Sequence, residues 1–154
     1  RTEQWAAPVL VKVGAVYNNE TRRFTTPLQV YNFPLASGKV WNQNAQNFNE
    51  VTGRTGVINR FVRVRGWAKV TPPAGTFDAA STQVIMRLAD DEFWRHGTEC
   101  NYLVWYAPAV RGMVREERNA QYLEKGGGGD GAGAGTIRTQ FGTLQLVSFT
   151  PGGS

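Results

Sequence analysis

Residues 59–73, NRFVRVRGWAKVTPP, decide the fold that this sequence predicts. Side chains two residues apart along a strand point to the same side of it. One side carries Val62, Val64, Ala68 and Val70, which suits a protein core. The other carries Phe61, Arg63, Arg65, Trp67 and Lys69, with no acidic residue in the stretch to neutralise the charges. That second side is expected to meet water, a partner chain or a polyanion.

Further runs with a period of two predict strands along the rest of the chain. They cover residues 7–17, 25–33, 60–70, 81–88, 101–107 and 135–150. Pro72 and Pro73 end the central run, because proline cannot donate to a strand ladder. Gly142 is expected to mark a bulge or bend in the last run. The one helix predicted is a short one at 113–123.

These runs predict an all-β fold: a single domain spanning residues 1–154, built as an antiparallel β-sandwich. A jelly roll is preferred to an immunoglobulin-like sandwich, because the connections are long and the Cys–Trp–Cys core pattern is absent. The predicted long connections are 34–57, 89–99 and 108–135. Connections of such length are typically functional or in contact with a partner.

Positive charge is concentrated in the first part of the chain. The net charge is +5 and the sequence pI about 9.7. Residues 1–87 hold eleven Lys and Arg against four acids, whereas residues 88–154 hold six against eight. This balance favours a polyanionic partner, and Arg, the more frequent cation here, suits forked contact with phosphate. No apolar run is long enough to span a bilayer, so no membrane association is expected.

Three other patterns in the sequence contain residue types that bind phosphate, bind metal ions or act in catalysis. The glycine run in 124–136 precedes a predicted strand and lacks the Lys of a phosphate loop, so a surface loop is expected. Asp90, Asp91 and Glu92 offer oxygens for a structural divalent cation, if a neighbouring chain adds more. Cys100, the single cysteine, excludes an internal disulfide, and its spacing from His96 does not by itself make a catalytic pair. No other cofactor and no enzymatic activity are expected.

The basic residues are the main functional candidates. Like charges side by side repel unless a counter-charge is present, so the set is expected to bind a polyanion. The sequence has no RNP aromatic motif, zinc finger or helix-turn-helix signature, so contact is expected with phosphates rather than with base sequence. The candidate RNA-binding residues are Arg1, Arg22, Arg23, Arg60, Arg63, Arg65 and Lys69.

Residues 64–73, VRGWAKVTPP, resemble a strand in the coat proteins of the small plant satellite viruses. QWAAPVLVKVGAV near the start and GTLQLVSFT near the end are similar to that family's first and last strands. The resemblance implies a jelly-roll subunit that self-assembles into the smallest (T=1) icosahedral shell around RNA, in a virion assembled in the host cytoplasm. It also implies a basic arm upstream of residue 1. The glycine loop at 126–135 departs from the family pattern.

The sequence therefore predicts a structural capsid protein that self-assembles and binds RNA through phosphate contacts. The alternative from another class is a carbohydrate-binding β-sandwich that uses its tryptophans as stacking platforms. A hydrolytic enzyme on the same scaffold ranks last, because it would need converging carboxylates that spacing does not reveal.

Overall fold

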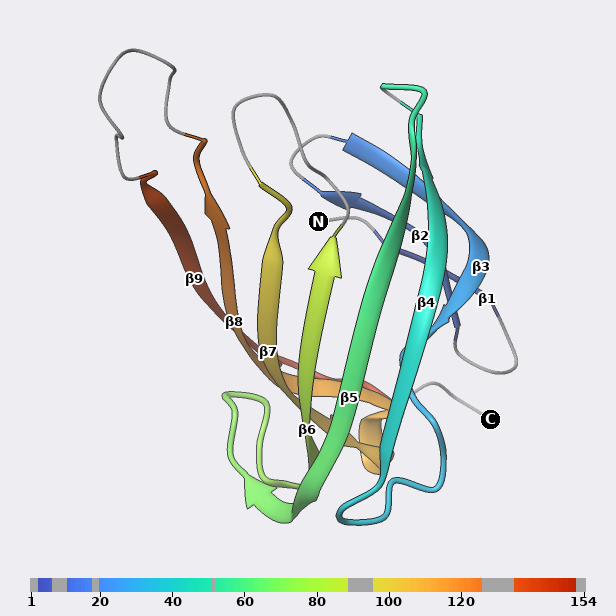
Figure 1. Ribbon diagram of the computed structural model, residues 1–154. Helices are drawn as coiled ribbons and strands as arrows, with labels where there is room; N and C mark the ends of the chain where they lie inside the picture. The colour runs from blue at the N-terminus through green and yellow to red at the C-terminus, as the bar shows by residue number, and fades with distance from the viewer. Residues whose placement is uncertain are drawn as a thin grey trace.

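The protein folds as one nine-stranded antiparallel sheet in which every strand pairs with its neighbours in sequence (Figure 1). The computed structural model describes residues 3–6, 11–17, 20–50, 52–88, 96–125 and 135–151, with side chains from residue 23 onward. The strands are β1 (Glu3–Ala6), β2 (Val11–Tyr17), β3 (Glu20–Gln29), β4 (Val40–Asn49), β5 (Thr55–Val70), β6 (Phe77–Leu88), β7 (Glu99–Ala107), β8 (Gly112–Leu123) and β9 (Ile137–Gln145). A short 3-10 helix, η1 (Pro108–Val110), joins β7 to β8. No helix within the described residues is long and apolar enough to cross a membrane.

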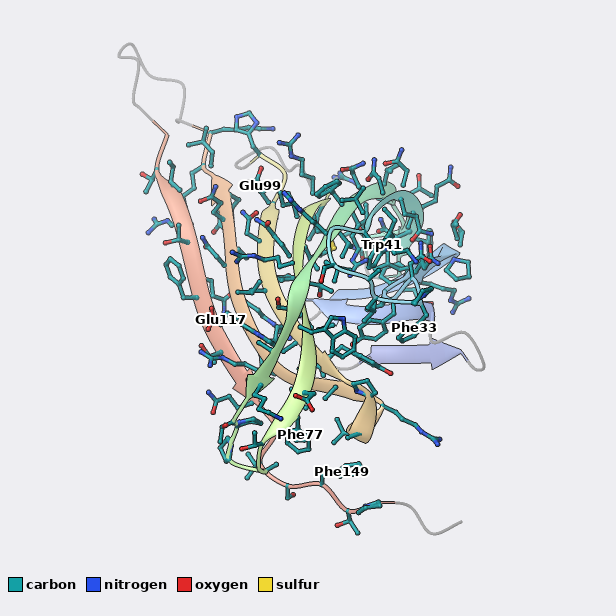
Figure 2. The ribbon with its side chains drawn as sticks, turned by 90° about the horizontal axis from the view of Figure 1, so that it is seen from below. Phe33, Trp41, Phe77, Glu99, Glu117 and Phe149 are labelled. Carbon is teal, nitrogen blue, oxygen red and sulfur yellow. The ribbon has the colours of Figure 1, made fainter. Side chains whose placement is uncertain are left out.

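The all-β, antiparallel class that the sequence predicts is confirmed. The connectivity is simpler than the two Greek keys of a jelly roll, which bring together strands that are distant in sequence. Each connection here joins adjacent strands, so the sheet is a meander that curls over its core. The two edge strands, β1 and β9, lie on opposite sides of the molecule (Figures 1 and 2).

The sheet has a core face and an outer face. Up to Val64, the side chains of β5 alternate between these two faces. Ile58, Val62 and Val64 are fully buried on the core face, whereas Val57 and Arg63 are exposed on the outer face. The first buried cluster of the core face consists of Phe24, Leu28, Ala45, Ile58, Met86, Leu88 and Cys100. The second consists of Leu35, Trp41, Val62, Val64, Ala80, Val84 and Tyr106. The predicted inward positions of β5 and β6 are thus confirmed up to Val64 and from Val84 to Leu88.

A β-bulge at Gly66 exchanges the two faces in the last part of β5. Val64 lies opposite Thr82 and Gly66 opposite Ser81, so Arg65 is an extra residue without its own partner. Trp67 consequently lies opposite the core residue Ala80, and its indole N–H donates to the Leu35 carbonyl oxygen at 2.9 Å. The prediction that Trp67 and Lys69 share a face with Arg63 is therefore wrong, because the added residue shifts the alternation by one.

The bulge also moves the end of β5 into a separate cluster. Ala79 and Trp105 each precede a core-face residue, so they point to the outer face. There they pack with Val70, Ala107, Val114 and Leu146, among others. Ala68, which was predicted to be in the core, is exposed.

Three local predictions need correction. Residues 113–123 form most of strand β8 rather than a helix, because β7 and β9 pair with this segment on both sides. The predicted connection 34–57 contains β4, whose Asn- and Gln-rich sequence has low strand propensity. Gly142 lies opposite Arg118 in an unbroken register, so it marks no bulge.

Candidate nucleic-acid interface

Two of the predicted RNA-binding residues, Arg63 and Arg65, are exposed side by side on β5. Neither has an ion-pair partner within the described part of the chain. Along the outer face, Arg63 is followed by Gln83, Leu103 and then Glu117, one residue per strand. At about 4.8 Å per strand the first acid of this row is roughly 14 Å away. That exceeds the screening length of about 8 Å at physiological salt.

Arg60, three residues earlier, is not available to an anion on the outer face. It lies on the core face and is only 7% exposed. Its guanidinium donates to the carbonyl oxygens of Gln29 at 3.0 Å and Val30 at 3.4 Å. Arg60 therefore ties the chain that leaves β3 to the middle of β5. Arg60 therefore does not share the outer face with Arg63, because the two residues are three positions apart on a strand whose side chains alternate between faces.

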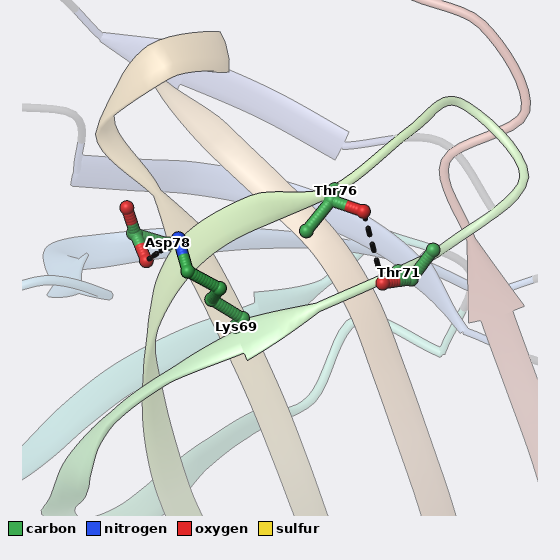
Figure 3. Close-up of polar contacts among 4 residues, drawn as sticks. All are labelled: Lys69, Thr71, Thr76 and Asp78. Carbon is green, nitrogen blue, oxygen red and sulfur yellow. Dashed lines mark hydrogen bonds and ion pairs between the residues drawn. The ribbon is translucent and has the colours of Figure 1, made fainter.

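Lys69 is exposed but has a counter-charge. Its ammonium group lies 3.1 Å from the Asp78 carboxylate across the β5–β6 hairpin (Figure 3). The same hairpin is closed by a hydrogen bond of 3.1 Å between the Thr71 and Thr76 hydroxyl groups. The sequence stretch 59–73 contains no acid, yet the hairpin brings one from the next strand. Lys69 therefore contributes less free positive charge than the sequence predicts.

The N-terminal candidates are placed only in part. Arg23 is exposed on β3 and forms an ion pair with Glu50. Arg22 lies in β3 opposite Asn49, but its side chain lies outside the described residues, and so does Arg1 altogether. The proposed cation ligands Asp90, Asp91 and Glu92 also lie outside the described residues. Within the described residues, no group of three or more His, Cys, Asp or Glu could hold a metal ion.

Four other cations of the described chain are neutralised by nearby acids. Arg87 pairs with Glu99 at 3.3 Å, Arg115 with Glu117 at 2.6 Å, Arg118 with Glu116 and Arg138 with Glu124 at 2.9 Å. The hydrogen bond to Glu124 raises the pKa of Arg138 above its ordinary value. Figure 2 shows that the labelled acids Glu99 and Glu117 lie toward the β7–β9 side of the molecule. Arg63 and Arg65 differ from these cations, because both are exposed and neither has an acidic partner among the described residues.

A cluster of amide side chains lies farther along the outer face, beyond Phe61 and Val40, and the sequence prediction missed it. Asn42, Asn44 and Asn59 form a cluster on the outer face of β4 and β5. The Asn59 amide donates to Asn44 at 2.7 Å and to Asn42 at 3.4 Å. The signal for it is the amide-rich run of residues 42–49, which the sequence predicts as part of the connection 34–57. Amides can donate to phosphate and sugar oxygens without adding charge.

The three tryptophans whose side chains the structure describes, and the cysteine, are held by contacts with the rest of the fold. Trp41 is buried and donates to the Gln29 carbonyl oxygen at 3.3 Å. The Arg115 guanidinium covers the half-buried ring of Trp105, 5.0 Å from its centroid. Trp67 is 49% exposed with its N–H engaged. Cys100 is buried in the core cluster of Phe24, whereas His96 is exposed.

No family model, no curated protein and no solved structure matches this chain.

Proposed function

We propose that this chain is the structural subunit of a coat that encloses RNA, and that it holds the RNA through phosphate contacts on the outer face of its sheet. The observation that carries the RNA contact is the pair Arg63 and Arg65. They stand adjacent and exposed, whereas six other cations of the described chain have an acid in contact.

Electrostatics explain why such a pair favours a polyanion. Two neighbouring guanidinium groups repel each other, and no acid among the described residues forms an ion pair with either of them. A phosphate chain relieves it and releases the counterions condensed on the RNA. Arg can also grip a phosphate with two parallel hydrogen bonds. The Asn42, Asn44 and Asn59 cluster, farther along the same face, adds uncharged donors for the same RNA backbone.

This arrangement favours binding without sequence selectivity. A broad sheet face with exposed cations has no helix or ribbon to insert into a groove, where bases are read. A coat subunit needs this kind of contact, because each copy meets a different stretch of the enclosed RNA.

The double variant R63Q/R65Q tests the contact. Each lost phosphate contact on single-stranded RNA reduces the salt dependence of binding by about 0.7 in the log–log slope. We expect the slope for a mixed-sequence single-stranded RNA to fall by roughly 1.4, measured by fluorescence anisotropy over a salt series. Stability should change by less than about 0.5 kcal/mol, because both side chains are on the surface.

A matched control is R87Q/R111Q, which removes the same formal charge from other exposed positions. Arg87 already has Glu99 in contact, and Arg111 lies at the end of η1. The control should keep a slope near that of the unmodified chain. If the two double variants lose the same amount of slope, only net charge matters and the Arg63–Arg65 contact is refuted.

A second candidate function is carbohydrate binding, favoured by the amide cluster, since Asn side chains suit sugar hydroxyl groups. In this alternative the chain binds glycans, and R63Q/R65Q leaves that binding unchanged while N44A/N59A abolishes it. A glycan array with both variants separates it from the coat proposal.

A further inference from the structure

Strand β9 is an exposed edge of the sheet. It is the last strand in the sheet order, and all nine of its residues are exposed, on both faces. Three of them are large and apolar: Ile137 is 64% exposed, Phe141 74% and Leu144 39%. The other edge strand, β1, has only four residues. Short edge strands are a common protection against pairing with other chains, and β9 lacks this protection.

The chain's own elements do not cover this edge within the described residues. Strand β1 lies on the opposite side of the curled sheet, so the sheet does not close into a barrel (Figures 1 and 2). The register between β8 and β9 is unbroken from Leu123–Ile137 to Arg115–Gln145. The edge is therefore regular as well as long, and it offers a continuous row of backbone groups to a further strand.

We infer that β9 pairs antiparallel with β9 of a second copy, about a two-fold axis at Phe141. This inference rests on the proposed structural role, since it supplies a contact through which subunits join. The pairing would place Phe141 opposite its own equivalent, Thr139 opposite the second copy's Thr143, and Arg138 opposite the second copy's Leu144. A two-fold contact of this kind uses the same patch on both subunits.

The charge pattern of β9 favours a second copy over a charged partner. Arg138 is the only charged residue in the strand, and Glu124 of the same chain already neutralises it. In the two-fold register, the two Arg138 side chains would stand six residues apart along the strand, roughly 20 Å. No like charges would face each other, whereas opposed Thr pairs and an aromatic pair are favourable cross-strand neighbours.

A charge-swap series tests the register. T139K/T143K places Lys opposite Lys twice across the two-fold axis, whereas T139K/T143E places Lys opposite Glu twice. We expect the dimer of the first variant to dissociate about tenfold more readily than that of the second, by sedimentation velocity over a concentration series. Mixing T139K/T143K with T139E/T143E should restore the dimer mass. Both positions are exposed, so the far-UV circular dichroism of each variant should stay that of the unmodified chain.

A disulfide gives an independent readout. In a C100A background, F141C should form a crosslinked dimer on oxidation, because the two residues face each other across the axis. Q145C should not, because its two copies would lie eight residues apart, roughly 27 Å. Equal crosslinking of the two variants would overturn the inferred register.

The outcomes separate this inference from the proposed function. The β9 pairing is overturned if the chain is monomeric at 100 µM, or if T139K/T143K and T139K/T143E dissociate equally. Either result leaves the R63Q/R65Q salt slope as a valid test of RNA contact. Conversely, an unchanged R63Q/R65Q slope with a register-dependent dimer refutes the RNA contact alone.

Discussion

Arg60 and Arg63 show how the environment of a single residue sets its role. Both are arginines on β5, but Arg60 is buried and satisfies two carbonyl oxygens, whereas Arg63 is exposed without an acid in contact. A buried guanidinium that satisfies backbone acceptors acts in stability. An exposed guanidinium attracts anions through its electrostatic field. The same side chain therefore serves two unrelated purposes three residues apart.

This contrast gives a prediction. Replacing Arg60 with Met removes the guanidinium donor from the Val30 carbonyl oxygen and leaves the Gln29 carbonyl oxygen with the Trp41 indole alone. The free energy of unfolding should fall by about 1–3 kcal/mol, the usual penalty for unsatisfied buried polar groups. Urea denaturation monitored by tryptophan fluorescence measures it. R63M is the matched control and should change stability by less than about 0.5 kcal/mol. Similar losses for the two variants would contradict the assignment of Arg60 to the fold.

At the scale of the element, the bulge in β5 is the feature with the widest effect. One extra residue, Arg65, moves Trp67 to the core face and sends Val70 to the cluster on the outer face. Gly66 makes this possible, because residues other than glycine rarely adopt its φ of 153°. An added Cβ at Gly66 would have room, since the closest atom is the Ser37 hydroxyl oxygen at 3.7 Å. Backbone strain rather than collision is therefore the expected penalty.

We predict that G66A lowers the free energy of unfolding by about 1–3 kcal/mol through this strain. G142A is the control on another strand: Gly142 has no positive φ, and no atom lies within 4 Å of its added Cβ. G142A should be neutral or slightly stabilising, because glycine is unfavourable inside a strand. Thermal and urea denaturation of the two variants give the comparison. Equal stability of G66A and the unmodified chain would mean that the bulge relaxes without strain.

At the scale of the whole molecule, the loop between β3 and β4 covers part of the main core. Tyr31 packs on Tyr106 with ring centroids 4.7 Å apart, and Phe33 packs on the same ring at 5.3 Å. The Lys39 ammonium holds this loop by hydrogen bonds to the Asn32 and Pro34 carbonyl oxygens. Burial, with a smaller contribution from Tyr106, raises the pKa of Tyr31 from 10.0 to about 12. The core thus contains a phenol that resists ionisation.

This pKa predicts alkaline destabilisation. Because the folded-state pKa is raised, the folded protein retains a proton that the unfolded chain loses above pH 10. The contribution of Tyr31 is fully present below pH 10.0 and is lost as the pH rises toward about 12. The free energy of unfolding should fall over this window by an amount on the order of 2 kcal/mol more than in Y31F. Parallel pH profiles of Y31F and the unmodified chain would show that Tyr31 ionises normally.

The sequence by itself determined the strand class and the position of the core strands. Period-two alternation is a local property, so the buried Val62, Val64, Val84 and Met86 could be read from it. The exposure of Arg63 and Arg65 follows from the same alternation. Segments with weak strand propensity could not be assigned in this way. Residues 113–123 and the amide-rich β4 are strands because their neighbours in the sheet pair with them.

Only the tertiary structure decided which charges remain free and which edge remains open. Asp78 neutralises Lys69 because the hairpin turn brings two strands together. Arg60 is not exposed to an anion, because it lies on the core face of its strand. The first contact depends on the register of the β5–β6 hairpin, and the second joins Arg60 to residues about thirty positions earlier; alternation along one strand contains no information about either. The exposure of both faces of β9 has the same origin. A strand becomes an edge through its place in the sheet order, which depends on the pairing of all nine strands at once.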